Sequence, residues 1–488
     1  MQKYLNNYYV LNCSTEIEIL NVLNKRMDVF YNNPKNIVLS EVLSNSDHLI
    51  KNIELTEMCN ISKISSGKTP ISRSQGKSSE YTIPLLRTSN IKKGEIYIDE
   101  VTTTFISEKD LSDSNIVLEN DILITIVGAT LKIVGRAAIY NLEEYHSSIN
   151  QNIARIRCTN ESVIPKYLMI YLNSTFAQKQ IERISKQGNQ VNLNAKEVGE
   201  IKVIVPDLEI QKSIIAQYEK LFNQLQNSKD IIDTGLEKIS NLLCNYTGLI
   251  EPILNEKNSV FINEISSIRL DYNFYNPTYN SYIDYILSKN DEYPIMTIKE
   301  LAYGVFRGDT PSQYYSSGIK VLQINNIDPF KLTYEDAKFI SEEEYKRKPR
   351  FQLRENDLLI SGVGPPLGEV CIVKRDDLPL AAYNHISVIR LNENLIDPLY
   401  LCAFLNSSFG QMQMKKYYTG VRQIYLTNEW IEKLLILVPP FELQKIIADE
   451  VSKVLSSICN AEKNFSEIES TIFDDILYEY LKIDKELH

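Results

Sequence analysis

The stretch that decides the fold occurs twice in the chain. Residues 164–176 read IPKYLMIYLNSTF, and residues 397–409 read DPLYLCAFLNSSF. Shortly after each of them, VPDLEIQK (205–212) is matched by VPPFELQK (438–445), again 233 positions later. A period this long is too large for one unit of a solenoid, whose repeats span about 20–50 residues. We therefore expect two similar domains, each followed by its own connector.

The repeat extends upstream of these segments. NQNIARIR (150–157) matches YNHISVIR (383–390) at the same offset, and further upstream the offset becomes 236. The pairs found there, in upstream order, are ENDILIT (119–125) with ENDLLIS (355–361), IPLLRTSNI (83–91) with IKVLQINNI (319–327), SGKTP (66–70) with RGDTP (307–311), and RMDVFYNNP (26–34) with RLDYNFYNP (269–277). The duplication thus covers most of the chain, which predicts a pseudo-twofold molecule with two similar sites.

The composition predicts a cytoplasmic protein without a metal site. The 488 residues suffice for two to four domains, and no apolar run reaches the length of a membrane-spanning helix. The N-terminus is too polar for a signal peptide. The seven cysteines form no CxxC pair, and only four histidines are present. These features are typical of reduced cytosolic thiols and argue against both a disulfide framework and a zinc site.

The formal charge of −11 is unevenly distributed. Residues 206–251 carry a net charge of −3 and residues 441–488 carry −6, so two segments supply most of the excess. Basic clusters lie inside the repeats instead, at 68–93, 345–354 and 411–428. Because a local patch matters more than net charge for phosphate contact, the acidic balance does not exclude nucleic acid, although each patch taken alone is also compatible with a solvated face.

Two segments have the spacing of long amphipathic helices. Mostly apolar residues alternate by four and three positions from Ile214 to Leu242, and again 233 residues later from Ile447 to Asp475; the weak positions are Ser228, Gly235, Ala461 and Asp475. This heptad pattern buries one seam, and prolines at 206 and 439–440 mark where each helix begins. We expect two antiparallel helices of roughly 40 residues, about 60 Å long, that bury their seams on each other.

The remainder of each copy reads as short strands between turns, with two short helices, Pro165–Gln180 and Pro398–Gln411. We therefore expect a mixed α/β (α+β) fold of two similar domains joined by two long, antiparallel, coiled-coil-like helices. The predicted boundaries are 1–49 for an N-terminal segment, 50–206 for the first domain, 207–253 for a central helical spacer, 254–292 for a connecting segment, 293–440 for the second domain and 441–488 for a distal helical spacer. The N-terminal segment is expected to meet the C-terminal helix.

Three motifs imitate catalytic sites and are rejected. SSGKTP (65–70) lacks the first glycine of a phosphate-binding loop, and its copy has Asp309 in place of the lysine. NPTY (276–279) resembles an amino-methyltransferase motif, but no glycine-rich loop for AdoMet accompanies it. VPDLEIQK imitates the spaced carboxylates of a nuclease, but its copy loses Asp207. We expect no catalysis, cofactor or metal in this chain.

What remains are polar loops that differ between the two copies. The loop 128–135 corresponds to 364–368, and 188–193 corresponds to 421–426. Asn, Gln, Arg and Lys suit contact with base edges, while Gly, Ser and Thr suit close approach to phosphate; the alternative for each loop is an ordinary turn. A shared scaffold with divergent loops is the pattern expected if each copy reads a different DNA sequence.

These duplicated motifs, in this order, resemble the specificity subunit of type I restriction–modification systems. The resemblance covers nearly all of residues 20–480, and it implies two target-recognition domains held apart by two antiparallel helices. It further implies binding of double-stranded DNA with a bipartite target, docking of two methyltransferase subunits, and restriction (helicase-nuclease) subunits bound through them. AdoMet, ATP and Mg²⁺ would belong to those partners. The alternatives are a subunit of a type IIB-like or methylation-only system, and a scaffold that joins proteins without binding DNA.

The candidate DNA-binding residues combine basic, amide and hydroxyl side chains of the loops and patches. In the first copy they are Lys68, Thr69, Arg73, Lys77, Arg87, Ser89, Thr130, Lys132, Lys186, Asn189 and Gln190. In the second copy they are Arg307, Thr310, Gln323, Asn325, Arg347, Arg350, Lys415, Lys416, Tyr418, Arg422 and Gln423.

Overall fold

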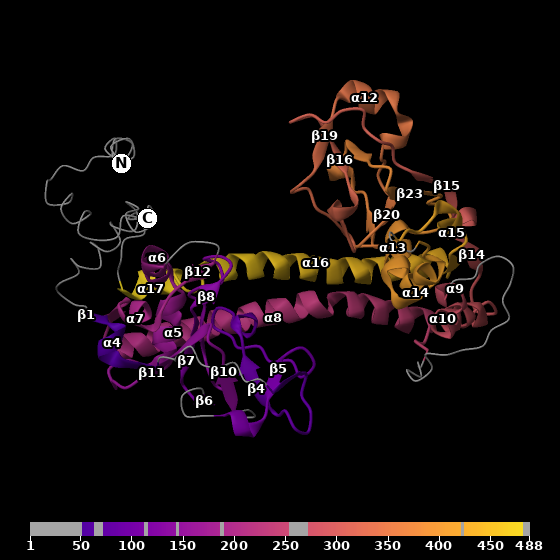
Figure 1. Ribbon diagram of the computed structural model, residues 1–488. Coiled ribbons are helices and arrows are strands. Elements are labelled where there is room, and N and C mark those ends of the chain that lie inside the picture. The colour runs from indigo at the N-terminus through magenta and orange to yellow at the C-terminus, as the bar shows by residue number, and fades with distance from the viewer. Residues whose placement is uncertain are drawn as a thin grey trace. The chain divides into compact units, whose positions relative to one another are not determined.

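The computed structural model describes residues 51–62, 72–111, 116–142, 146–185, 190–252, 272–420 and 424–481 (Figure 1). The chain divides into two compact units, Met1–Leu225 with Glu467–His488, and Gln226–Ser466. We call them unit 1 and unit 2. The predicted contact of the N-terminal segment 1–49 with the C-terminal helix lies outside the described residues.

Each unit contains the same four-stranded antiparallel sheet. In unit 1 its order is β2 (Cys59–Ser62), β11 (Ile153–Cys158), β7 (Ile122–Thr125) and β9 (Ala137–Ile139). In unit 2 it is β15 (Ala302–Arg307), β23 (Ile386–Leu391), β20 (Leu358–Ser361) and β21 (Val370–Ile372). The register between the third and fourth strands is the same in both units, since Ile124 pairs with Ala137 and Ile360 pairs with Val370.

The apolar runs ILIT and LLIS form the third strand of each sheet because both faces are covered. Ile122 and Ile124 belong to the main core of unit 1, whereas Leu123 between them belongs to a second core on the opposite face. Leu358 and Leu359 divide between two cores of unit 2 in the same way. Successive side chains of a strand point to opposite faces, so a strand buried on both sides reads as a continuous apolar run.

A second sheet lies beyond the four-stranded sheet in each unit. In unit 1, β4 (Ile83–Leu86) pairs antiparallel with β5 (Thr104–Ile106) and parallel with β10 (Ser147–Ile149), and β3 (Arg73–Gln75) and β6 (Ile116–Val117) complete it. In unit 2, β16 (Ile319–Leu322) pairs in the same two ways with β19 (Lys338–Ile340) and β22 (Leu380–Ala382). The sequence predicts strands at IPLLRT, DILITIV, RAAIY and NIARIRC in the first copy and at KVLQI, DLLISGV, EVCIV and ISVIRL in the second, and each of these segments contains a strand in the structure.

Small elements complete each unit. In unit 1 they are β1 (Lys51–Glu54) paired with β13 (Lys202–Val205), β8 (Val127–Gly128) paired with β12 (Val191–Asn192), α4 (Leu55–Met58) and α7 (Ala195–Gly199). In unit 2 they are β14 (Ile295–Thr297) paired with β24 (Leu435–Leu437), β17 (Ile327–Asp328) paired with β18 (Lys331–Leu332), α9 (Tyr272–Tyr275), α10 (Pro277–Ser288), α11 (Ile298–Leu301), α12 (Glu342–Arg347) and α15 (Asn428–Glu432).

Each predicted short helix is two helices in the structure. They are α5 (Pro165–Asn173) and α6 (Thr175–Ile184) in unit 1, and α13 (Pro398–Asn406) and α14 (Ser408–Tyr417) in unit 2. The break falls at Ser174 and Ser407, which have extended backbones with ψ of 162° and 166°. Each serine hydroxyl donates to the carbonyl three residues earlier at 2.6 Å, which satisfies a free carbonyl of the ending helix.

The entries to the long helices are fixed by one glutamine in each copy. The Gln211 amide accepts from the Ile164 N–H at 2.9 Å and donates to the Pro206 carbonyl at 2.8 Å. Gln444 makes the same two bonds with Asp397 and Pro439, both at 2.8 Å. This explains why the glutamine of VPDLEIQK and VPPFELQK recurs, because a buried amide must find partners for both ends.

The long helices are α8 (Leu208–Thr247) and α16 (Phe441–Thr471). None of the nine seam positions predicted in the first helix is exposed. Within unit 2, Gly235 of α8 faces Ile458 of α16 so closely that an added Cβ would lie 2.4 Å from the isoleucine Cδ1. The helices therefore pack directly on each other, as the heptad pattern predicts.

The second seam ends earlier than predicted. Helix α16 has 31 residues, and a turn at 472–474 separates it from α17 (Asp475–Leu481), so Asp475 is exposed and not part of a seam. The turn brings Asp474 next to Thr175 within unit 1, where the Asp474 carboxylate accepts from the backbone N–H and the hydroxyl of Thr175, both at 2.6 Å. This bond caps α6, a role that a continuous helix would not allow.

Candidate nucleic-acid interface

The RGDTP turn of unit 2 follows strand β15 and passes close to the backbone of Ala382. A Cβ on Gly308 would lie 2.0 Å from the carbonyl oxygen of Ala382, so only glycine fits there. The Gly308 N–H donates to the Ile386 carbonyl at 3.2 Å, and the Asp309 N–H donates to the Ala382 carbonyl at 3.1 Å. The turn is thereby fixed against β22 and β23, which places Arg307 and Thr310 at its two ends.

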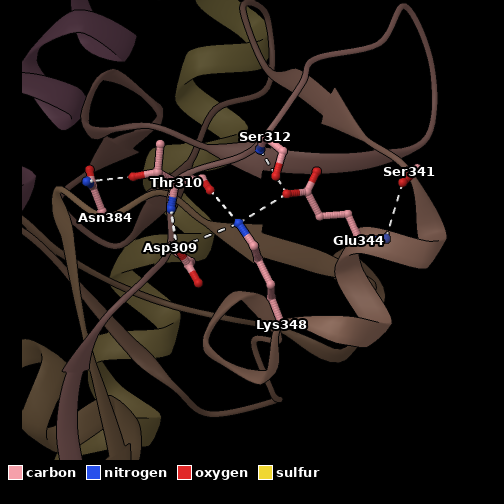
Figure 2. A network of polar contacts seen from close by, with 7 residues as sticks. All are labelled: Asp309, Thr310, Ser312, Ser341, Glu344, Lys348 and Asn384. Atoms are coloured by element: carbon pink, nitrogen blue, oxygen red, sulfur yellow. Dashed lines mark hydrogen bonds and ion pairs between the residues drawn. The ribbon is translucent and has the colours of Figure 1, made fainter.

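A network of polar contacts holds the far side of this turn (Figure 2). The Lys348 ammonium donates to the Thr310 carbonyl at 2.7 Å and forms an ion pair with Glu344 at 3.1 Å. The Glu344 carboxylate is buried and accepts from the Ser312 N–H at 2.8 Å. On the other side, the Asn384 amide donates to the Thr310 hydroxyl at 2.8 Å. Helix α12 thus fixes the loop after the turn.

A pocket of about 540 Å³ lies beside the other end of the turn. Its lining residues are Arg307, Val363, His385, Tyr425, Thr427 and Asn428. The Arg307 guanidinium is half-buried and donates to the carbonyls of Leu426 at 3.1 Å and Asn384 at 3.5 Å. Burial lowers the pKa of Arg307, and burial together with the neighbouring Arg307 cation lowers the pKa of His385.

The loops that line the pocket are joined by a backbone bridge that both units share. Val363 pairs antiparallel with Tyr425 in unit 2, and the matching pair in unit 1 is Val127 with Asn192. The bridge is the same while the side chain it carries changes from asparagine to tyrosine. At other matched positions, His385 stands where unit 1 has Asn152, and Thr427 where it has Asn194. The scaffold is common, and the side chains it presents differ.

The predicted site residues fall into three groups. The exposed group is Arg73, Lys77, Ser89, Thr130, Lys132, Gln190, Thr310, Asn325, Arg347 and Arg350. The partly buried group is Arg87, Arg307, Gln323, Lys415, Lys416 and Tyr418. Lys68, Thr69, Lys186, Asn189, Arg422 and Gln423 lie outside the described residues.

Several of these residues make contacts within the fold. The Lys416 ammonium bonds to the Asn280 side chain and lies 4.9 Å from the centre of the Phe274 ring, and burial lowers the pKa of Lys416. The Tyr418 hydroxyl donates to the Leu367 carbonyl at 2.8 Å, and burial raises the pKa of Tyr418. Lys77 pairs with Glu100 at 2.6 Å. A DNA contact by any of the three stays a prediction.

The repeated segments LLRTSNI and VLQINNI owe their likeness to turn geometry. The Asn90 side-chain oxygen accepts from the Arg87 N–H at 2.9 Å, and Asn326 accepts from the Gln323 N–H at 2.8 Å. The asparagines close the turns, while Arg87 and Gln323 stand at the same position in the two copies. Again a shared backbone carries different side chains.

Sequence reasoning did not identify His385, Tyr425, Thr427 or Asn428 as pocket residues. His385 lies in the repeated YNHISVIR segment, which suggested a strand rather than a site. All four residues lie directly next to a repeated strand or helix, at positions where the side chain differs between the two copies. A search for such positions would have identified them. Among the described residues no cluster of potential metal ligands is present, and none of the helices in that part of the chain could cross a membrane.

Comparisons with known proteins agree with the duplication. The family model of the type I restriction modification DNA specificity domain matches residues 49–234 and 270–470. The chain is 30% identical over 161 residues to the type I restriction enzyme EcoBI specificity subunit of Escherichia coli, and 24% identical over 161 residues to the MjaVIII specificity subunit of Methanocaldococcus jannaschii. These alignments cover 33% and 32% of this chain, and 33% and 38% of the relatives.

Among solved structures, the chain is similar to the type I restriction-modification S subunit from M. genitalium. The TM-score is 0.47 with 12% sequence identity, and the match covers 89% of this chain and 97% of the other.

Proposed function

The chain belongs to the type I restriction modification DNA specificity family, and from this premise we propose that it is the subunit that recognises DNA in a type I restriction–modification system. Each unit would read one half of a bipartite target in double-stranded DNA. The observation that carries the proposal is the shared backbone with divergent side chains, such as the bridge that presents Asn192 in unit 1 and Tyr425 in unit 2. Two equal scaffolds with unequal contact residues suit two different half-sites.

Domain exchange tests this proposal. We expect that replacing residues 50–206 with those of a relative changes one half of the methylated sequence and leaves the other half unchanged. Methylome sequencing of a host carrying the operon gives the readout. A change in both halves, or in neither, would contradict the assignment of one half-site to each unit.

The same proposal assigns the chemistry to partners. We infer that the chain alone, in the cytoplasm, has no methyltransferase, nuclease or ATPase activity, and that AdoMet, ATP and Mg²⁺ act in methyltransferase and restriction subunits. Turnover by a homogeneous preparation free of partners would contradict this. Such turnover would have to survive further purification of the chain.

We further propose that two methyltransferase subunits dock on the acidic helices. Charge reversal at Glu462, Glu467 and Glu469 of α16 is expected to reduce co-purification of the methyltransferase. Glu462 already pairs with Lys331 at 2.6 Å, so Lys331→Ala is the matched control that breaks this ion pair without reversing the helix charge. Unchanged co-purification of the triple variant would count against this surface.

A further inference from the structure

We propose that the pocket beside the RGDTP turn, lined by Arg307, His385 and Thr427, is a binding site for one phosphate group, which in the working complex is a phosphate of the DNA backbone. The source of the phosphate rests on the proposed function, whereas the site itself rests on the charges and hydrogen bonds of the residues that line the pocket.

The charge balance of the pocket favours an anion. Among the described residues, the Arg307 guanidinium forms no ion pair with a carboxylate, and its recorded partners are two neutral backbone carbonyls. A half-buried cation without a counter-ion is costly, because burial disfavours the charged form. The adjacent His385 adds a ring that can take up a proton when an anion binds. Among the described residues the Arg307 cation in the pocket therefore has no negative counter-ion, and a bound phosphate would supply one.

The neutral groups favour a phosphate over a base edge. Asn428 is the residue that could read adenine with two hydrogen bonds, but each end of its amide already makes one bond within the fold, which fixes its orientation. Its oxygen accepts from the Ser387 hydroxyl at 2.7 Å, and its nitrogen donates to the Val305 carbonyl at 3.4 Å. The donors that remain beside the Arg307 cation include the His385 ring and the Thr427 hydroxyl, which makes no capping bond to the helix it precedes. Arginine and hydroxyl donors are the usual partners of phosphate oxygens.

The geometry is fixed before any ligand arrives. Arg307 is held at one end of the turn by the Leu426 carbonyl, and the other end is held by the Lys348 and Asn384 contacts. A Cβ on Gly362 would lie 2.9 Å from the His385 carbonyl oxygen, so the backbone segments beside Arg307 meet closely there. Fixing the cation in advance lowers the entropy cost of binding.

The single tryptophan gives a direct readout in the intact chain. Trp430 lies two residues after Asn428, and its backbone N–H donates to the Thr427 carbonyl at 3.1 Å. Its ring stacks on Tyr417 at 4.5 Å. We expect inorganic phosphate to change Trp430 fluorescence in a saturable way. Arg307→Gln should weaken that binding about tenfold and Thr427→Val about threefold, as expected for one charged and one neutral hydrogen bond.

A second arm of the experiment uses DNA. The affinity of the full chain for a random duplex is measured against salt concentration. One phosphate contact contributes about 0.9 to the slope of log K against log salt, so Arg307→Gln should lower the slope by about one. Arg375→Gln is the matched control, because it removes the same charge at an exposed position of the same unit.

The outcomes separate the inference from the proposed function. Equal slopes for the wild type and Arg307→Gln, or equal losses for Arg307→Gln and Arg375→Gln, overturn the phosphate site while DNA binding stands. Phosphate binding that needs Arg307, in a chain that binds no duplex, keeps the site and overturns the DNA assignment. If Arg307→Gln does not fold, Thr427→Val decides, and unchanged phosphate binding in that variant contradicts the site.

Discussion

At the scale of single residues, each unit contains a carboxylate–guanidinium pair whose aspartate is buried. Asp121 pairs with Arg157 at 2.6 Å, and Asp357 pairs with Arg390 at 2.6 Å, and the exposed fractions of the two aspartate side chains are 1% and 2%. Each aspartate also accepts from the backbone N–H three residues before it, at 2.8 Å. The preceding Asn120 and Asn356 have positive φ angles of 64° and 65°, which asparagine tolerates.

Removing one partner of such a pair leaves a buried charge without compensation. We expect Asp357→Asn to lower the free energy of unfolding of unit 2 by about 3 kcal/mol. Urea unfolding followed by the fluorescence of Trp430, which lies in unit 2, measures it. Asp121→Asn is the matched control in unit 1, and a tryptophan transition shifted more by Asp121→Asn than by Asp357→Asn would contradict the expectation.

The Glu344 network adds a pH dependence. Burial raises the pKa of Glu344, but the Ser312 N–H and hydroxyl and the Lys348 ammonium together lower it below its usual value of 4.5. A carboxyl group whose pKa is lower in the folded state stabilises that state at higher pH, and the contribution is lost as the pH falls through the folded value.

We therefore expect Glu344→Gln to lower the Tm at neutral pH, with a difference from wild type that closes between about pH 5 and about pH 3. Thermal scans followed at Trp430 give the comparison. Glu343→Gln is the control, since Glu343 is exposed on the same helix and forms no ion pair among the described residues. A difference that persists unchanged at low pH would mean that Glu344 acts through packing alone.

At the scale of elements, Gly235 shows how closely the long helices approach. Glycine costs about 1 kcal/mol relative to alanine inside a helix, yet here it makes room for Ile458. We expect Gly235→Val to destabilise unit 2 by about 2 kcal/mol through overpacking. Ile458→Ala also destabilises when made alone, by opening a cavity.

The double variant tests whether Gly235 acts through its contact with Ile458 or through the conformational preference of its own helix. If the two side chains meet across the helix pair, the loss in Gly235→Val with Ile458→Ala is smaller than the sum of the two single losses, and the interaction energy from urea unfolding is at least about 0.5 kcal/mol. Additive losses would show that Gly235 acts within its own helix only.

The elements themselves could largely be predicted from the sequence, but their ends could not. Alternation and apolar runs located three of the four strands in each four-stranded sheet, because burial on one or both faces leaves a pattern; β2 and β15 were not predicted. The breaks at Ser174 and Ser407 are invisible in that pattern, since a hydroxyl bond to a preceding carbonyl has no periodicity. The turn after Thr471 was missed because Asp474 finds its partner, Thr175, 299 residues away.

The candidate site was predicted in part for the same reason. Basic residues such as Arg307 stand out in a sequence, and the RGDTP turn drew attention to it. Tyr425 and Thr427 did not, because a pocket depends on loops that meet only after folding. Lys416 shows what a charge in the sequence leaves open, since its ammonium contacts Asn280 and Phe274 within the fold, and its contact with DNA stays a prediction.

At the scale of the whole molecule, the long helices extend through the boundary between the units. We predict that their length sets the spacing between the two half-sites of the DNA target. Helix α8 passes from unit 1 into unit 2 at Leu225, and α16 passes the other way at Ser466. We expect that inserting four residues after Leu225 and four after Ser466 lengthens both helices by roughly 6 Å, at about 1.5 Å per residue, with the seams nearly in phase.

At about 3.4 Å per base pair, this insertion should widen the gap between half-sites by one or two base pairs and leave the half-site sequences unchanged. Methylome mapping of the variant gives the gap directly. Inserting two residues in each helix is the control, because it rotates the apolar seams by about 200° and should destabilise the pair. An unaltered gap in the four-residue variant would mean that the helices do not set the spacing.

The backbone bridge between Val363 and Tyr425, with its twin between Val127 and Asn192, has a consequence for how such a protein changes over generations. Main-chain hydrogen bonds do not depend on which side chain the residue carries, so the loop keeps its path when that side chain is replaced. If each unit reads one half-site, as proposed, selection can then alter that half-site by single substitutions at nearly constant stability. The other half, built on its own copy of the bridge, need not change with it.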